Sequence, residues 1–376
     1  MTAKISRFLE DVRPPTPCVV VDLDVIKNNY LNLRHWLPLA RVYYAVKANP
    51  APEIVRLLAD MGSSFDVASR PEIELCLANG ATPDRLSFGN TIKKKADIAF
   101  AYEQGVRLFA FDSEAELDKL AEAAPGARVF CRLLMTCEGA EWPLSRKFGC
   151  EIDMARDLLV AARDRGLVPY GVSFHVGSQQ TDLDQWDVAV GKTAMLFTAL
   201  NAVGITLKMV NLGGGLPARY RTDVPGVDRY ADAIMHPMTR HFGNDLPTMI
   251  IEPGRGLVGD AGILEAEVVL ISKKGYGEEV RWVYLDIGKF GGLAETMDES
   301  IKYRIETDRD SEATGPVVLA GPTCDSADIL YEKAGYEMPL GLAVGDRVRI
   351  MATGAYTTSY SAVNFNGFAP LKAYYI

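Results

Sequence analysis

The chain has 376 residues, with 48% hydrophobic and 24% charged side chains and a formal net charge of −9. This length exceeds one ordinary core and predicts about two domains, and the balanced composition excludes an intrinsically disordered protein. The negative charge argues against a nucleic-acid partner and is compatible with a cationic substrate.

The six cysteines form no C-x-x-C pair, and a chain of this size does not need disulfides for stability. We therefore expect reduced thiols and a cytoplasmic protein without a metal site. The N-terminus has no apolar h-region, and no apolar run approaches the roughly 18 residues of a spanning helix, so we expect no membrane partner. The cysteines are Cys18, Cys76, Cys131, Cys137, Cys150 and Cys324.

From residue 41 to 253, short runs of β-branched and aromatic residues alternate with amphipathic helical patterns. Ser113 followed by Glu116 predicts a capping box for one of these helices. Several of the helical patterns end in the glycine that is typical after a helix. The helical patterns include 52–62, 71–80, 96–105 and 154–166. The expected strands are 41–47, 64–69, 85–89, 107–112, 128–135, 170–176, 207–213 and 248–253.

This alternation predicts parallel strands joined by crossover helices, and eight units fit a closed (β/α)8 TIM barrel. A doubly wound open sheet is the competing fold, which the lack of a G-x-G-x-x-G motif after the first strand disfavours. We expect the barrel to span residues 23–260.

After residue 260 the sequence predicts strands with few helices between them, which indicates a second, mainly β domain built as a β-barrel or β-sandwich. The strand-like segment 17–24 is expected to join it, because chain termini often lie close together. We therefore expect an α/β plus β protein, with 1–22 and 261–376 in the second domain. The predicted strands are 263–274, 280–288, 316–321 and 346–354.

The carboxyl ends of barrel strands converge on one mouth, where the chemistry of such folds collects. Each polar residue there also has a structural interpretation. Lys47 could be solvated just beyond its strand, His175 could be a core histidine, and we expect Asp112 to be a helix N-cap, as Asp66 could also be. The polar residues at the eight ends are Lys47, Asp66, Asn90, Asp112, Arg132, His175, the turn 213–215 and Glu252.

The three glycines 213–215 follow an apolar strand, and they could form only a tight turn or let backbone N–H groups approach a phosphate. EPGRG (252–256) adds Arg255 and another glycine, which favours a phosphate pocket. A lysine, a phosphate pocket, a histidine and a carboxylate together suggest pyridoxal 5'-phosphate. A carboxylate beside the ring nitrogen favours decarboxylation over racemisation.

With these and further motifs, the chain resembles the ornithine decarboxylase-like branch of the alanine racemase-like, fold-type III pyridoxal-phosphate enzymes, from about residue 17 to its end. The motifs occur in the family's order, which makes the set much more specific than any one of them. They are AVKANP, FDVAS, SFHVGSQ, NLGGGLP, EPGRG, GPTCDSADIL and GAYTTSY with FNGF.

The resemblance implies that Lys47 carries the cofactor in a Schiff base, with Asp66 beside it and Arg132 near the ring hydroxyl. His175 would stack on the ring, and Glu252 would pair with the ring nitrogen. The phosphate would be held by Ser178, Gly214, Gly215, Gly254, Arg255 and Tyr356.

In this family two subunits of a head-to-tail homodimer share their active sites. The resemblance implies that Cys324 protonates the substrate carbon after loss of CO2, and that Asp325 binds the distal ammonium of a basic amino acid. Phe365 would wall the partner's site, although its spacing from Tyr356 is about one residue longer than in the eukaryotic enzymes. Asp298 and Glu299 are acidic candidates for a second contact to the distal amine, and Tyr356 is expected to contact the substrate as well as the phosphate.

The expected reaction is decarboxylation of L-ornithine to putrescine, a step of polyamine biosynthesis, with L-lysine as a second substrate that gives cadaverine. Diaminopimelate decarboxylases carry Cys-Glu where this chain has Cys324 and Asp325. A primary lysine decarboxylase, or one for arginine or diaminopimelate, is the alternative. A non-catalytic regulatory relative is a remote one, because such relatives lose cofactor or catalytic residues that this chain retains.

Overall fold

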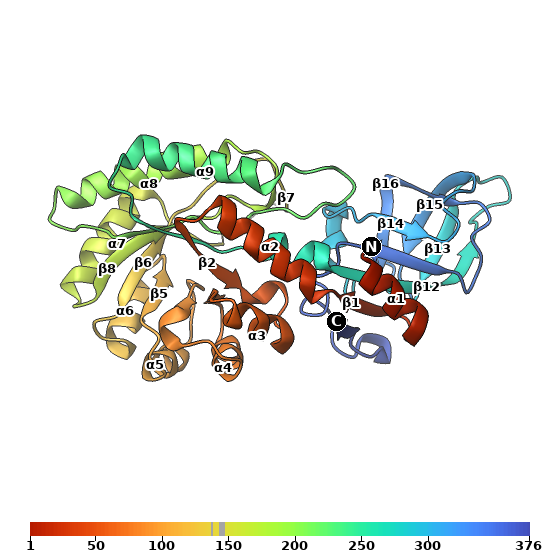
Figure 1. The fold of residues 1–376 in the computed structure, drawn as a ribbon, viewed down its shortest axis with the longest axis horizontal. Helices are drawn as coiled ribbons and strands as arrows, with labels where there is room; N and C mark the ends of the chain where they lie inside the picture. Colours follow the sequence, from red (N-terminus) through yellow and green to blue (C-terminus); the bar gives the residue numbers. More distant parts are fainter. Residues whose placement is uncertain (137, 143–146) are drawn as a thin grey trace. The chain divides into compact units, whose positions relative to one another are not determined.

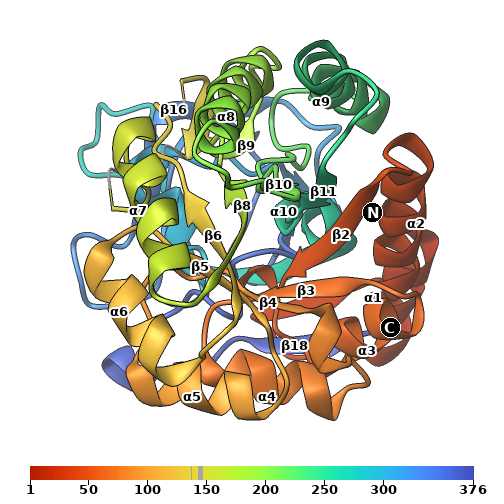
Figure 2. The same cartoon turned by 90° about the vertical axis from the view of Figure 1, so that its left-hand side faces the viewer.

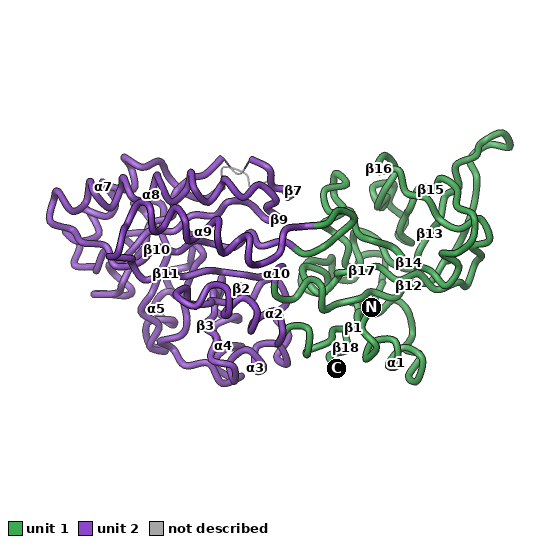
Figure 3. Tube along the Cα trace, turned by 45° about the horizontal axis from the view of Figure 1, so that its top comes forward, with its two compact units in different colours: residues 1–26, 218–223, 257–376 green, residues 27–217, 224–256 purple. Residues whose placement is uncertain are grey.

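The structure is a computed structural model that describes residues 1–136, 138–142 and 147–376, so Cys137 lies outside the described residues. The chain divides into two compact units, coloured separately in Figure 3. The barrel unit comprises residues 27–217 and 224–256, and the β unit comprises residues 1–26, 218–223 and 257–376. The domain boundaries expected at residues 23 and 260 stay a prediction.

Eight parallel strands close into a barrel in the barrel unit, in the order β10-β11-β2-β3-β4-β5-β6-β8. Of these strands, β2, β5, β6 and β8 are labelled in Figure 1. Each strand overlaps one of the eight predicted runs, which confirms the (β/α)8 barrel and excludes the open sheet. The strands are β2 (Ala40–Ala45), β3 (Ser64–Val67), β4 (Leu86–Phe88), β5 (Leu108–Phe111), β6 (Arg128–Arg132), β8 (Val168–Ser173), β10 (Met209–Asn211) and β11 (Thr248–Ile251).

Helices form a ring outside these strands, as Figure 2 shows. The glycines predicted to end α3, α4, α5 and α7 all have positive φ angles, of 86°, 95°, 97° and 78°, at positions 62, 80, 105 and 166. The helices of the ring are α2 (Leu23–Trp36), α3 (Pro52–Asp60), α4 (Arg70–Ala78), α5 (Lys95–Glu103), α6 (Glu114–Ala123), α7 (Ile152–Asp164), α8 (Gln185–Asn201) and α9 (Val227–Phe242). The short helix α10 (Arg255–Val258) follows β11 and is not part of the ring. Two short strands, β7 (Ala140–Trp142) and β9 (Ser178–Gln180), pair with each other.

The interior of the barrel is packed with apolar side chains from several strands, so the barrel is not a pore. One buried cluster combines residues of β2, β5, β6, β10 and β11. Its members are Tyr43, Leu108, Ala110, Phe130, Met209 and Ile250. Because this core fills the interior, polar chemistry is confined to residues at and beyond the carboxyl ends of the strands.

The β unit is built on a mixed sheet in the order β14-β17-β12-β13-β15-β16, with β1 paired to both β12 and β18. This confirms the second, mainly β domain and the N-terminal strand within it, although β1 ends before residue 24 because α2 begins at Leu23. The elements α1, β14, β16 and β18 were not predicted. The bounds are α1 (Ala3–Val12), β1 (Cys18–Val21), β12 (Gly262–Ser272), β13 (Arg281–Leu285), β14 (Ile305–Thr307), β15 (Thr314–Ala320), β16 (Ile329–Pro339), β17 (Arg347–Met351) and β18 (Lys372–Tyr375).

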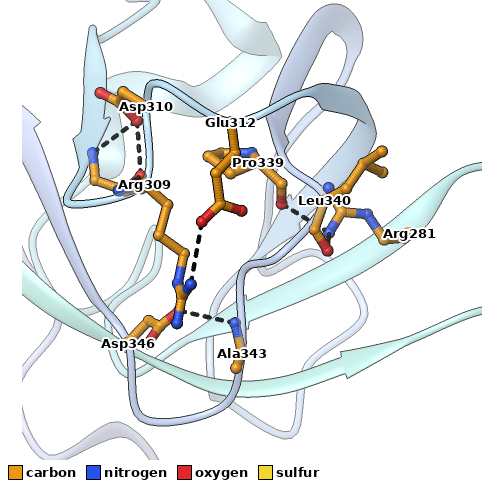
Figure 4. A network of polar contacts seen from close by, with 9 residues as sticks. Arg281, Arg309, Asp310, Glu312, Pro339, Leu340, Ala343 and Asp346 are labelled. Carbon is orange, nitrogen blue, oxygen red and sulfur yellow. Dashed lines mark hydrogen bonds and ion pairs between the residues drawn. The ribbon is translucent and has the colours of Figure 1, made fainter.

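A polar network ties together the turns at one end of this sheet (Figure 4). Arg309 bonds to Asp346 at 2.9 Å and to Glu312 at 3.1 Å, and Asp346 also accepts the N–H of Ala343 at 2.9 Å. The Ala343 N–H first, and then Arg309, hold the pKa of Asp346 below its usual value. The turn before β15 is thereby joined to the turn before β17.

Among the described residues, no helix has both the length and the apolar character needed to cross a membrane.

Candidate active site

Lys47 lies just beyond the carboxyl end of β2, in the single 3-10 turn Val46–Ala48. Next to it, the Ala45 N–H donates to the carbonyl of Pro253 at 3.1 Å and joins the ends of β2 and β11. The side chain of Lys47 is exposed. Little free energy is therefore spent on desolvating the Lys47 ammonium in the cofactor-free protein. A ligand at the barrel mouth can reach the amine.

Asp66 lies on β3, in register with Ala45 of β2 and Ser87 of β4. The residue is 8% exposed, and its Oδ1 has no hydrogen-bond partner among the described residues. Burial first, and then the nearby Glu252 carboxylate, raise the pKa of Asp66 well above its usual range. A Cβ atom at Gly89 would lie 1.9 Å from this Oδ1, so only glycine leaves room for the carboxyl group.

Glu252 follows β11, and Asn211, the last residue of β10, holds its carboxylate. Asn211 Nδ2 donates to Glu252 Oε1, while Asn211 Oδ1 accepts the N–H of Gly213 at 3.0 Å. The N–H of Glu252 in turn donates to the Gly213 carbonyl at 2.8 Å. The carboxylate and the glycine turn are therefore fixed to each other.

His175 follows β8, and its ring accepts a hydrogen bond at Nδ1 from the N–H of Gly177 at 3.0 Å. This bond indicates a neutral ring with its proton on Nε2. Burial first, and then the positive charges of Arg132 and Lys47, lower the pKa of His175 well below its usual value, which favours the same state. A Cβ atom at Gly214 would lie 3.3 Å from His175 Nε2 and 2.6 Å from the Glu252 carbonyl oxygen.

Ser178 and Arg255 bring donors to the same end of the barrel. Arg255 Nη2 donates to Ser178 Oγ at 3.2 Å, and Arg255 is 3% exposed. The carbonyl of Gly215 accepts the N–H of Gln180 at 2.9 Å, which anchors the glycine turn beside β9. A guanidinium, a hydroxyl and glycine N–H groups are donors that suit a phosphate.

These barrel residues fit pyridoxal phosphate on two observations. A buried oxygen, Asp66 Oδ1, has no hydrogen-bond partner within residues 1–136, 138–142 and 147–376, and a buried polar atom of this kind is expected to meet a ligand or water. In addition, a side chain at Gly214 would collide with the Glu252 backbone, so the turn leaves its space open beside His175. The structure therefore brings together Lys47, Asp66, Arg132, His175, Ser178, Gly214, Gly215, Glu252, Gly254 and Arg255 at one end of the barrel unit.

The other predicted site residues lie in the β unit. Cys324 is exposed, and its N–H donates to Asn366 Oδ1 at 2.9 Å. Asp325 is also exposed, and its Oδ1 accepts the N–H of Ala327 at 2.8 Å. Whether the predicted site residues of the β unit act in the barrel site stays a prediction. They are Asp298, Glu299, Cys324, Asp325, Tyr356 and Phe365.

Two of these residues have structural partners within the β unit. Glu299 Oε1 accepts the N–H groups of Glu332 at 2.8 Å and Lys333 at 2.7 Å, so one oxygen is already engaged with β16. The ring of Phe365 lies 4.9 Å from that of Phe290, centroid to centroid. Asp298 and Tyr356 have positive φ angles of 53° and 55°, which fixes unusual backbone geometry at both.

The capping prediction for α6 is wrong. Ser113 is the N-cap residue but makes no side-chain cap bond, and Asp112 caps nothing, because its Oδ2 accepts the N–H of Gly149 at 2.7 Å. Glu116 cannot reach back to the cap because it is buried against Lys93 Nζ, at 3.0 Å, and Lys119 Nζ, at 2.5 Å.

The possible N-cap role of Asp66 is also excluded, because Asp66 lies within β3 and Ser69 caps α4. Asn90 donates from Nδ2 to the carbonyl of Ala68 at 3.3 Å and so joins the ends of β3 and β4.

Sequence reasoning missed Asn211 and Glu72. Asn211 is the first residue of the NLGGG motif, but only the glycines of that motif were interpreted as part of the site. No sequence pattern shows where a carboxamide side chain points. Glu72 lies in the first turn of α4, where its Oε2 accepts the Ala68 N–H at 2.6 Å, and burial raises its pKa. The nearby charge of Lys47 opposes that rise, which places Glu72 close to the mouth.

Comparison with known proteins identifies the family. Residues 23–259 match the pyridoxal binding domain of pyridoxal-dependent decarboxylases. The chain belongs to the pyridoxal-dependent decarboxylase family. The decarboxylase is 36% identical to the lysine/ornithine decarboxylase of Selenomonas ruminantium over 358 residues, which cover 95% of this chain and 88% of that protein.

Solved structures agree with this assignment. The decarboxylase resembles SrLDC of Selenomonas ruminantium in complex with PLP and cadaverine, with 33% identity, a TM-score of 0.89 and coverage of 100% and 94% of the two chains. It also resembles the arginine decarboxylase of Paramecium bursaria Chlorella virus, with 27% identity, a TM-score of 0.90 and coverage of 100% of both chains. The decarboxylase is therefore a carboxy-lyase, and its cofactor is pyridoxal 5'-phosphate.

Proposed function

We propose that the decarboxylase acts on small basic amino acids, converting L-ornithine to putrescine and CO2, with L-lysine as a second substrate that gives cadaverine. The observation that carries this proposal is the similarity to a lysine/ornithine decarboxylase over 95% of the chain. Arginine and diaminopimelate are alternative substrates, and the similarity to an arginine decarboxylase makes arginine the more relevant of the two.

We propose that Lys47 joins the cofactor through a Schiff base, with the neutral ring of His175 against its face. Glu252 pairs with the ring nitrogen, and Asp66 and Arg132 lie at the ring's edge. The exposed amine of Lys47 and the hydrogen bond between Arg255 and Ser178 support these roles. The proposed phosphate ligands are Ser178, Gly214, Gly215, Gly254, Arg255 and Tyr356.

When bound, pyridoxal phosphate supplies an electron sink conjugated to the α-carbon of the substrate. Glu252 would lie at the ring nitrogen, held there through its hydrogen bond from Asn211. Lys47 would be the residue that holds the cofactor between turnovers and is exposed enough to exchange with the α-amine of a substrate. Cys324 donates a proton to the α-carbon after CO2 has departed.

We propose that Asp325 binds the distal ammonium of the substrate by a charge-assisted hydrogen bond. Asp298 is the better candidate for a second contact, because backbone N–H groups already engage one oxygen of Glu299. Phe365 walls the site. A neutral amino acid would leave these carboxylates without a partner, so it should be a poor substrate. Lysine and ornithine differ by one methylene, which changes the free energy of transition-state binding by only about 1–3 kcal/mol.

The first experiment compares CO2 release from ornithine, lysine, arginine and meso-diaminopimelate under identical conditions. We expect ornithine to have the highest kcat/KM and lysine to follow within roughly 200-fold. Replacement of Asp325 by Asn should lower kcat/KM for both and leave the absorbance of the bound cofactor unchanged. A preference for diaminopimelate would overturn the assignment of Asp325, and a preference for arginine would overturn ornithine as the substrate.

A second experiment tests the proposed head-to-tail homodimer. Lys47→Ala and Cys324→Ala proteins are mixed under conditions in which subunit exchange is shown separately by differential tagging. If each site takes Lys47 from one subunit and Cys324 from the other, half of the sites in a mixed dimer are intact, and activity is partly restored. Absence of activity in mixed dimers that have demonstrably formed would count against shared sites.

A further inference from the structure

The side chain of Asn211 lies between the two ends of the proposed cofactor site. Asn211 ends β10, where it stands in register with Ser173 of β8 and Ile250 of β11. It is completely buried. Because Asn211 is held by a strand on either side, its side chain starts from a rigid backbone.

Each half of the Asn211 carboxamide has a different partner. Nδ2 donates to Glu252 Oε1, and Oδ1 accepts the N–H of Gly213 at 3.0 Å. The backbone closes the same loop, since the Glu252 N–H donates to the Gly213 carbonyl at 2.8 Å. One side chain therefore sets both the rotation of the carboxylate and the start of the turn that leads to Gly214 and Gly215.

The chemistry of an amide suits this position better than that of other polar groups. An amide donor stabilises the ionised form of Glu252 without itself gaining or losing a proton. A carboxylate at position 211 would instead repel Glu252, beside a third carboxyl group at Asp66 that already feels the charge of Glu252. Because Asn211 engages Oε1, Oε2 would be the oxygen that meets the ring nitrogen in the proposed site.

We propose that Asn211 is a positioning residue that couples the ring-nitrogen end of the site to its phosphate end, by fixing Glu252 Oε1 and the Gly213 N–H with one carboxamide. This inference rests on the proposed role of Glu252. It implies that a change at Asn211 weakens recognition at both ends of the cofactor, although Asn211 touches neither.

The test measures binding of three ligands to cofactor-free protein by absorbance titration. The ligands are pyridoxal phosphate, its 1-deaza analogue, in which C–H replaces the ring nitrogen, and pyridoxal, which lacks the phosphate. The affinity ratio of pyridoxal phosphate to the deaza analogue reports the nitrogen end. The ratio of pyridoxal phosphate to pyridoxal reports the phosphate end.

For Asn211→Ala we expect pyridoxal phosphate to bind about 10–100-fold more weakly, as is typical when an orienting partner is removed, and both ratios to fall toward one. Asn211→Asp keeps an acceptor for Gly213 but loses the donor to Glu252. It should reduce the nitrogen ratio strongly and the phosphate ratio much less. This nearly isosteric variant keeps the test decisive if the alanine variant does not fold.

Asn79→Asp is the matched control, because Asn79 is also a buried asparagine, 8% exposed, and its Nδ2 and Oδ1 bond to Leu75 and Arg56. It should change neither ratio. If both Asn211 variants weaken all three ligands equally, Asn211 is only a structural residue and the inference is wrong. Glu252→Gln tests the underlying role separately: a nitrogen ratio unchanged in that variant would overturn the proposed function of Glu252, whatever the Asn211 variants show.

Discussion

The barrel unit contains two charge clusters that treat buried carboxyl groups in opposite ways. In the paired cluster, formed by Lys93, Glu116 and Lys119, the side chains of Lys93 and Glu116 are 0% and 2% exposed. Lys93 Nζ bonds to the carbonyls of Asn90 and Ala110 at 2.7 and 2.6 Å and lies 3.0 Å from Glu116 Oε1. Every charge there has a partner supplied by the chain.

In the mouth cluster, formed by Lys47, Asp66, Arg132 and Glu252, a buried carboxyl oxygen of Asp66 has no partner among the described residues. Burial dominates the pKa shift in both clusters: it lowers the pKa of Lys93 to about 8 and raises that of Asp66 well above its usual range. A perturbed pKa alone therefore does not distinguish the two. The charge partners distinguish them. Glu116 Oε1 also makes no hydrogen bond of good geometry among the described residues, but it lies 3.0 Å from the ammonium of Lys93, whereas Asp66 Oδ1 has neither a hydrogen bond nor an ion pair within the same residues.

The largest expected effect is at Lys47. Lys47→Ala should lower kcat by roughly 10⁴–10⁶-fold, as removal of other covalent catalytic residues does. Borohydride should no longer attach the cofactor to the protein. Because the side chain is exposed, urea unfolding of the cofactor-free protein should not change. The exposed Lys94→Ala is the control, and cofactor fixed in the Lys47→Ala protein would assign the Schiff base to another lysine.

The next largest effect tests the paired cluster. Glu116→Gln leaves the buried ammonium of Lys93 without its counter-charge, so the free energy of unfolding should fall by roughly 3–5 kcal/mol. Urea titration of the cofactor-free protein measures it. Glu114→Gln is the control on the same helix, since its partner Arg165 lies at the surface. If both variants were equally stable, the difference drawn between the clusters would lose its basis.

A smaller effect is expected at Gly89, where a side chain would meet Asp66 Oδ1. Gly89→Ala should lower the free energy of unfolding by about 1–3 kcal/mol and weaken cofactor binding, because the carboxyl group must move. The double variant Gly89→Ala with Asp66→Ala removes the collision. Its loss in free energy of unfolding should therefore be smaller than the sum of the losses in the two single variants. Simple additivity would show that the two residues do not interact.

The smallest expected effect is an increase in the free energy of unfolding when Asp66 is replaced. An acid whose pKa is higher in the folded than in the unfolded state stabilises most below the unfolded pKa, about 3.9 for Asp, and loses that contribution as pH rises through the folded pKa. Asp66 therefore makes cofactor-free protein less stable as pH rises from 4 toward neutrality. Asp66→Asn should remove this slope and add about 1 kcal/mol at neutral pH, while weakening cofactor binding. Unfolding titrations at several pH values measure both, and a slope that persists in the variant would contradict the role of burial.

The sequence predicts the barrel well because its strands are local patterns: β-branched runs bounded by helices that end in glycine. It predicts the β unit less completely. β16, with the sequence ILYEKAGYEMP, mixes charges and glycine with apolar residues, and only its pairing with β15 makes it a strand. β18 is likewise defined by its partner β1, which lies at the other end of the chain.

For the site, the sequence predicts which residues stand at the strand ends, because strand position alone decides that. It does not predict side-chain pairing across the fold. TIKKK (91–95) has the composition of a solvated run, yet Lys93 is buried by a partner 23 residues away. The same limit hides Asn211, whose partner Glu252 lies 41 residues further along the chain.

The pairing of β1 with β12 and β18 also bears on how the protein is made. β1 leaves the ribosome long before its partners, which begin at Gly262 and Lys372. At about 5–20 residues per second, the stretch from β1 to β18 takes roughly 20–70 s to synthesise. Until β12 has been made, the apolar run Cys18–Val21 has no strand beside it, and its second edge stays unpaired until β18 follows, so this segment of a nascent chain is open to wrong partners and is one that a chaperone can protect.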